Sequence, residues 1–149
     1  MKKIVFLLAM FVATTSYLKA QIIDPVKWQF TAKKTGAQSY DLIITATLDK
    51  PWHIYSQNTG DGPVPTSFNF KKNPLITFVG NVKEQGKLIK EMDKNFNSIV
   101  SSYEGKVVFV QKITTKGAIK TNVAGEVEYM VCNNDRCLPP TKKTFNIKL

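Results

Sequence analysis

Two cysteines are the residues of this chain best suited to chemistry. Cys132 and Cys137 are the only cysteines, and the tripeptide Leu138-Pro139-Pro140 follows them. A bond between them would staple a β-hairpin, but the chain-entropy gain from so short a loop is only about 2 kcal/mol. A redox pair would instead present one sulfur to the thiolate of a partner. The spacing alone leaves three interpretations open: a structural disulfide, a redox pair, and a metal site that lacks two of the four ligands zinc requires.

A second concentration of reactive side chains is the run Trp52-His53-Ile54-Tyr55. Because side chains alternate along a strand, His53 and Tyr55 are predicted to share one face and to line a shallow site together. Trp52 and Ile54 would then point into the core. A single histidine in a strand is more often hydrogen-bonded or solvent-facing than functional, so both interpretations of His53 stay open.

The segment 84–103 differs from the rest of the chain. It is polar, with isolated apolar residues and no lasting period. This composition predicts one long irregular loop, and such loops in compact domains are usually functional or mobile. Phe96 lies within it between two asparagines. It either fills an edge of the core or covers a site.

The elements that must position these residues are predicted to be strands. Apolar residues alternate with a period of two, which is typical of half-buried antiparallel strands. Turn residues separate the runs, and about eight short strands in one domain predict an all-β, immunoglobulin-like antiparallel sandwich. The clearest runs are 28–32, 40–48, 107–113, 126–132 and 145–149.

The first twenty residues read as a secretory signal peptide. Two lysines precede an apolar run at 4–13, and Ala20 is the predicted cleavage site. The run is too short to span a bilayer as a helix, which needs roughly 20 apolar residues. We therefore expect an exported domain at 21–149 whose mature chain does not insert into a membrane. Export also permits a disulfide.

The net charge of +10 at first suggests a nucleic-acid or membrane partner. Removing Lys2, Lys3 and Lys19 with the signal segment reduces it to +7. The remaining positive charges are scattered lysines and a single arginine, Arg136. Base readout and bidentate phosphate binding favour arginine. We therefore expect no nucleic-acid partner.

Four motifs in order carry a resemblance: the Trp52-His53-Ile54-Tyr55 strand, the Gly-Pro-Val-Pro turn at 62–65, the Tyr103-Glu104-Gly105-Lys106 turn, and the ending Cys132…Cys137-Leu138-Pro139-Pro140. Together they resemble the N-terminal periplasmic domain family of the bacterial thiol:disulfide interchange protein DsbD. The resemblance covers residues 24–149. Its most specific part is the Cys…Cys-x-Pro-Pro ending.

The resemblance implies an immunoglobulin-like fold in which Cys132 and Cys137 shuttle electrons in the periplasm, with no cofactor and no metal. The pair would receive electrons from a membrane-embedded thiol reductase and pass them to thioredoxin-like or disulfide-isomerase proteins. It further implies that Phe96 caps the pair and that Tyr55 and His53 face it. Cys137 would form the mixed disulfide.

The 149 residues contain neither the membrane helices nor the thioredoxin-like domain of the full-length family protein. We therefore expect a separate membrane protein to supply the electrons. If the chain is an enzyme, it is a protein-disulfide reductase of the interchange type. The alternative is an exported binding module that recognises a partner through 84–103 and has a purely structural disulfide. A haem or metal chaperone using two thiols and His53 has less support.

Overall fold

The computed structural model describes residues 23–117 and 120–149, all as strands and connecting turns. The expected signal segment, 1–20, lies outside the described residues. No helix in the described ranges is long and apolar enough to cross a bilayer. The strands are β1 (Val26–Lys34), β2 (Ser39–Leu48), β3 (His53–Tyr55), β4 (Ser67–Phe70), β5 (Ile76–Gln85), β6 (Ile89–Asp93), β7 (Ser98–Glu104), β8 (Lys106–Thr115), β9 (Asn122–Tyr129), β10 (Val131–Cys132) and β11 (Thr141–Lys148).

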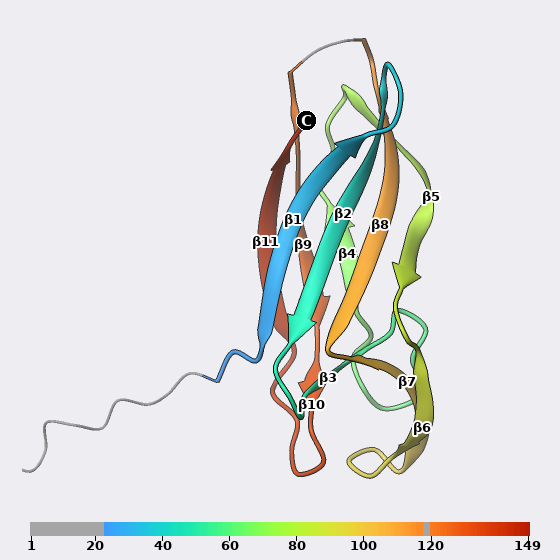
Figure 1. Cartoon of the computed structure of the whole chain (residues 1–149), viewed down its shortest axis with the longest axis vertical. Coiled ribbons are helices and arrows are strands. Elements are labelled where there is room, and N and C mark those ends of the chain that lie inside the picture. The colour runs from blue at the N-terminus through green and yellow to red at the C-terminus, as the bar shows by residue number, and fades with distance from the viewer. Residues whose placement is uncertain (1–22, 118–119) are drawn as a thin grey trace, which may run out of the picture.

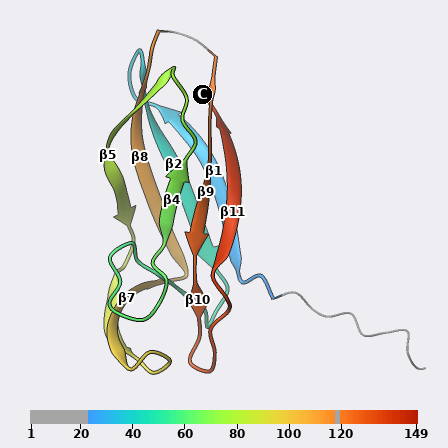
Figure 2. The same cartoon turned by 180° about the vertical axis from the view of Figure 1, so that it is seen from behind.

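Two sheets form the body of the molecule. One has the order β1-β2-β8-β5 and the other the order β11-β9-β4, and every pairing is antiparallel. Figures 1 and 2 show them as two layers seen from opposite sides. The described residues therefore form the antiparallel, immunoglobulin-like sandwich that the alternation predicted.

The period-two pattern of the sequence corresponds directly to burial. β9 alternates strictly between half-buried and buried residues, and β2 does so from Leu42 to Ala46. On β8 one face is fully buried, whereas the other is half-buried or exposed. Each strand therefore turns its apolar face to the opposite sheet, as expected for a sandwich.

Aromatic rings fill the space between the two layers. Trp28 packs on Tyr129 with ring centroids 5.0 Å apart, and Phe68 packs on Phe109 at 5.0 Å. Phe30 stacks on Phe145 at 5.1 Å. Such pairs add about 0.5–1.5 kcal/mol each to the burial of their apolar surface. This aromatic layer fixes the two sheets against each other.

A third, smaller sheet lies at the lower end of Figure 1, with the order β10-β3-β7-β6. It contains most of the segment 84–103, for which the prediction of one irregular loop was wrong. That segment continues β5 and then forms the β6–β7 hairpin, with only 94–97 as its turn. Its apolar residues show no clear period because the outer face of the hairpin stays exposed, as at Met92 and Ile99.

Candidate functional site

The two cysteines form a disulfide at the end of the small sheet. Cys132 ends β10, and the bond to Cys137 closes a turn in which the two residues also form an isolated antiparallel bridge. Asn133 shapes this turn. Its side-chain oxygen accepts the backbone N–H groups of Asp135 at 2.9 Å and Arg136 at 2.8 Å. The polar residues between the cysteines therefore build a tight hairpin, as their composition predicted.

The two sulfur-bearing residues differ in exposure. Cys132 is fully buried, whereas Cys137 is only partly buried. Cys132 belongs to a small apolar cluster with Tyr55 and Val100, and Cys137 packs against that cluster together with Phe96. An approaching thiolate would therefore meet Cys137 first.

His53 and Tyr55 lie on the same face of β3, as predicted. His53 is the cross-strand partner of Cys132 on one side and of Glu104 on the other. Cross-strand partners project to the same side of a sheet, so the histidine and the disulfide share one face. Trp52 and Ile54 are buried in the main core, again as predicted.

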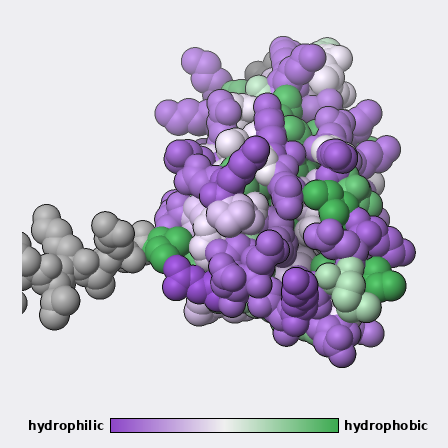
Figure 3. All heavy atoms as spheres, turned by 60° about the horizontal axis from the view of Figure 1, so that its bottom comes forward, coloured by the Kyte–Doolittle hydropathy of each residue, from purple (hydrophilic) through white to green (hydrophobic). Residues whose placement is uncertain are grey.

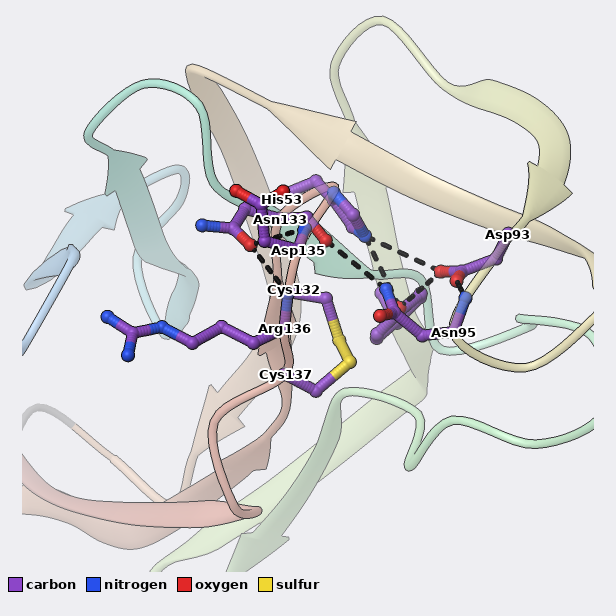
Figure 4. The surroundings of a disulfide bond; sticks show 9 residues. His53, Asp93, Asn95, Cys132, Asn133, Asp135, Arg136 and Cys137 are labelled. Carbon is purple, nitrogen blue, oxygen red and sulfur yellow. Dashed lines mark hydrogen bonds and ion pairs between the residues drawn. A yellow bond between two sulfur atoms is a disulfide. The ribbon is translucent and has the colours of Figure 1, made fainter.

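A buried carboxylate joins these two side chains. The Tyr55 hydroxyl donates to Asp93 Oδ2 at 2.5 Å, and His53 Nε2 lies 3.3 Å from the Tyr55 oxygen. His53 Nε2 is also 3.7 Å from Asp93 Oδ2. Because the tyrosine proton is directed to Asp93, His53 Nε2–H donates to the tyrosine oxygen. Figure 4 shows His53 and Asp93 on one side of the disulfide, while Arg136 points away from them.

Burial, hydrogen bonds and neighbouring charges together shift the pKa values of these three side chains. Burial lowers the pKa of His53 below its ordinary value of 6.5, although Asp93, Glu104 and Glu91 act in the opposite direction. Burial and then the hydrogen bond to Asp93 raise the pKa of Tyr55 well above 10. Burial pushes the pKa of Asp93 upward, but the hydrogen bonds from Tyr55 and the Asn95 N–H outweigh it and hold that pKa below 3.8. At neutral pH the group therefore consists of a neutral histidine, a neutral tyrosine and an ionised aspartate.

Phe96 sits in the turn of the β6–β7 hairpin and reaches the disulfide cluster. Its ring meets the ring of Tyr55 edge to face, with centroids 6.0 Å apart. Phe96 also lies against Gly62, where a Cβ would come within 2.7 Å of the Phe96 ring and where φ is +108°. Only glycine combines that backbone angle with that close approach. The Gly-Pro-Val-Pro turn therefore begins with the glycine against which the Phe96 ring packs.

The turn that carries Phe96 also touches the cysteine hairpin. The Asn95 side-chain amide donates to the backbone oxygen of Asn133 at 3.2 Å. Figures 1 and 2 both show these two turns side by side at the lower end of the molecule. A hollow of about 140 Å³ lies between them, lined among others by His53, Asp93 and Asn134.

The five site residues predicted from the sequence thus lie around one end of the small sheet: His53, Tyr55, Phe96, Cys132 and Cys137. Sequence reasoning missed Asp93 and Asn95. The spacing Asp93-Lys94-Asn95 was a usable signal, since an aspartate often accepts the N–H two residues on at a turn. That bond is present, from the Asn95 N–H to Asp93 Oδ1 at 2.7 Å.

Two further observations concern metal binding and the exposed surface near the site. Among the described residues, no three His, Cys, Asp or Glu side chains gather so as to hold a metal ion. The outer face of the β6–β7 hairpin exposes Leu88, Met92 and Ile99. Figure 3, which brings the lower end forward, shows patches of hydrophobic surface on one side of this end among hydrophilic residues.

The family model of the N-terminal domain of the thiol:disulfide interchange protein DsbD matches residues 19–149. The chain belongs to this family. The crystal structure of the Neisseria meningitidis DsbD N-terminal domain in the reduced form aligns with a TM-score of 0.58 at 12% identity, covering 89% of this chain and 93% of that one. It shares the fold of the DsbD N-terminal domain.

Other comparisons add less. The yeast GGA1 GAE domain aligns over 87% of this chain and 96% of its own, at 7% identity and a TM-score of 0.47, which is too low to carry an argument. No curated protein matches the sequence. Family membership in the DsbD N-terminal domains therefore rests on the family model, and the fold on the Neisseria structure. Membership makes the chain a module of thiol–disulfide interchange.

Proposed function

We propose that residues 21–149 form a periplasmic module that passes electrons through Cys132 and Cys137. The donor is a membrane-embedded thiol reductase, and the acceptors are exported thioredoxin-like or disulfide-isomerase proteins. Residues 1–20 serve as the export signal. The observation that carries the proposal is a disulfide with one buried and one partly exposed cysteine, in a chain of the DsbD N-terminal family.

The exchange proceeds in two steps. A thiolate of the reduced donor attacks Cys137 Sγ, forms a mixed disulfide and releases Cys132 as a thiolate that takes up a proton. The donor's second thiolate then attacks the donor sulfur of that mixed disulfide and releases Cys137. The donor leaves as a disulfide, and two electrons have moved to this domain. Transfer to an oxidised client is the same sequence in reverse, with Cys132 resolving the mixed disulfide.

The surrounding residues have supporting roles in this proposal. Phe96 covers the pair between reactions, because its ring packs on the cluster that contains Cys132. Tyr55 packs beside Cys132 in that cluster, and His53 is the partner of Cys132 on the neighbouring strand. A partner must displace Phe96 before its thiolate reaches Cys137.

Single-cysteine variants test the assignment of the two sulfurs. Cys132→Ala leaves the partly exposed Cys137 and should trap a mixed disulfide with periplasmic partners, detected on non-reducing gels and identified by mass spectrometry. Cys137→Ala leaves only the buried Cys132 and serves as the matched control, with much less trapping. Equal trapping by both variants would contradict the assignment of Cys137.

The reduction potential tests whether the disulfide is redox-active at all. Equilibration in dithiol buffers should give a potential above about −300 mV, below which structural disulfides usually lie. A pair that stays oxidised in those buffers, or a double cysteine variant that keeps full activity in cells, would leave a binding module with a structural disulfide as the better account.

A further inference from the structure

The turn 94–97 is attached to the body of the protein at both of its ends. Asp93 and Ser98 are cross-strand partners that close it. Asp93 is bonded to Tyr55 on β3, and the Ser98 hydroxyl donates to the backbone oxygen of Asp61 at 2.6 Å. The position of Phe96 over the disulfide is therefore set by the two residues that flank its turn.

The Asp93 attachment differs in kind from the others. Its carboxylate is buried, at 6% exposure, and each of its oxygens accepts one hydrogen bond. One comes from the Tyr55 hydroxyl on the sheet and the other from the Asn95 N–H in the turn. Hydrogen bonds to a charged group are roughly twice as strong as neutral ones. Removing one hydrogen-bond partner of a buried charge also costs much stability, because the charge is then left unpaired away from water.

The contact on the opposite side of the turn is weaker. The amide of Asn95 reaches the oxygen of Asn133 in a single neutral bond at 3.2 Å, on the exposed surface. Water competes readily for such a bond. The link between the turn and the cysteine hairpin can therefore break while the Asp93 link persists.

We propose that Asp93 is a positioning residue that holds the Phe96 turn closed over the Cys132–Cys137 disulfide. Its carboxylate clamps the turn backbone to the Tyr55 hydroxyl. The inference rests on the proposed function in that Phe96 must cover the pair. It adds a residue and a role that the cysteine, tyrosine and phenylalanine contacts do not supply by themselves.

The rate of disulfide reduction by dithiothreitol measures how often the turn opens. Asp93→Asn retains the shape of the side chain but leaves one acceptor oxygen for two donors. Tyr55→Phe keeps the ring against Phe96 and removes only the hydroxyl. Each variant should raise the second-order rate constant roughly ten- to hundredfold, the range that loss of one hydrogen bond to a charged group allows. The double variant should be no faster than the faster single variant, because both remove the same link.

A positioning role also predicts what stays constant. Reduction and reoxidation should accelerate together, so the reduction potential should match that of the wild-type protein. Asp135→Asn is the matched control for charge. It removes a carboxylate between the two cysteines whose oxygens make no hydrogen bond or ion pair within the described residues. Its rate should stay within about twofold of wild type.

Several results would overturn the inference. Acceleration by Asp135→Asn equal to that by Asp93→Asn would assign the effect to charge repulsion of the attacking thiolate. A rate within about twofold of wild type for Asp93→Asn, beside a fast Phe96→Ala, would show that the turn closes without the clamp. Should Asp93→Asn fail to fold, Tyr55→Phe decides by the same criterion. If disulfide reduction is also no faster in Phe96→Ala than in wild type while Cys132→Ala traps partners, Phe96 does not cap the pair. The role proposed for Asp93 is then wrong, whereas the proposed exchange function is retained.

Discussion

The sandwich body and the small sheet that carries the disulfide are held together by different forces. In the body, Phe109 is completely buried and packs on Trp28, two strands away in the same sheet, and on Phe68 of the facing sheet. The small sheet turns Ile54, Tyr103 and Val131 into the same core, but the buried cluster on its disulfide side contains only Tyr55, Val100 and Cys132. On that side, two carboxylates add hydrogen bonds that hold the sheet and its turns in place.

Asp93 is one of these carboxylates, and Glu84 is the other. Glu84 lies on β5 of the large sheet and accepts three hydrogen bonds, one from β7 of the small sheet and two from the residues that follow β3. The donors are the Ser56 hydroxyl at 2.7 Å, the Gln57 N–H at 2.7 Å and the Tyr103 hydroxyl at 2.9 Å. Burial, followed by the bond to Glu84, raises the pKa of Tyr103 well above 10. Glu84 therefore ties the small sheet to the sandwich.

This difference matters for a domain whose site must open. Apolar packing is cooperative and non-directional, so the body unfolds as a unit. Individual polar links can break one at a time and release a turn without loss of the core. A site that opens for a partner is best built from the second kind of contact.

The largest loss of stability should come from a substitution in the core of the sandwich body. Phe109→Ala removes a completely buried ring and should reduce the free energy of unfolding by about 3–5 kcal/mol, measured by urea denaturation. Phe96→Ala removes the ring of the same residue type from the half-buried turn and is the matched comparison. We expect it to cost much less stability while accelerating disulfide reduction. If Phe96→Ala proves as destabilising as Phe109→Ala, Phe96 is a core residue and not a cap.

An intermediate loss of stability should come from removing hydrogen bonds between the small sheet and the sandwich. Glu84→Gln leaves one acceptor oxygen for three donors and should cost about 1–3 kcal/mol. Amide hydrogen exchange should rise in β3 and β7 more than in β2 and β8.

Glu126→Gln provides the control for that variant. Glu126 lies on β9 of the sandwich surface, where its ion pair with Lys142 at 3.6 Å is half exposed. Such pairs contribute about 0–1 kcal/mol. Uniform exchange changes across all strands of the Glu84→Gln variant would show that the small sheet is not a separate cooperative unit.

The smallest effect concerns pH. Because the pKa of His53 is lowered in the folded protein, the folded form binds the proton less tightly than the unfolded chain. The contribution of His53 is fully present above pH 6.5 and is lost as the pH falls below 6.5 through the folded pKa. Asp93, whose pKa is also lowered, adds a second loss below about pH 3.8.

Two measurements check this sign. His53 is the single histidine of the chain, so one NMR resonance titrates it, and its midpoint should lie below 6.5. The urea midpoint of the wild-type protein should fall between pH 7 and pH 5 by more than that of His53→Gln. A midpoint above 6.5 would show that the carboxylates around His53 outweigh its burial, and parallel curves for the two proteins would show that they offset it.

The two regions also differ in how well the sequence predicts them. In the body, the alternation in 40–48 predicted β2, because one face of that strand is buried. The apolar run 107–113 predicted β8 as a strand largely buried on both faces, whereas only one face is completely buried. In the small sheet, the same reasoning missed β6 and β7. β6 buries no apolar residue, and β7 buries Val100 and Tyr103 without a strict alternation. β7 also pairs with β3, which is distant in sequence.

The candidate site shows the same division. The cysteine spacing predicted the hairpin, and strand alternation placed His53 and Tyr55 on one face. The polar context of 84–103 singled out Phe96, and the resemblance to the DsbD N-terminal family assigned it the role of a cap. Neither source indicated Asp93, whose partner Tyr55 lies 38 residues earlier in the chain. A buried carboxylate is recognisable only once its donors are known.

The sequence by itself determined the all-β class, the hairpin between the two cysteines and the family, because these follow from local periodicity and from motifs in a fixed order. Only the tertiary structure decided which cysteine is buried, what Phe96 packs against and which carboxylates hold the small sheet. Burial and hydrogen bonding of this kind depend on contacts between segments far apart in the chain, and a pattern read along the sequence does not contain them.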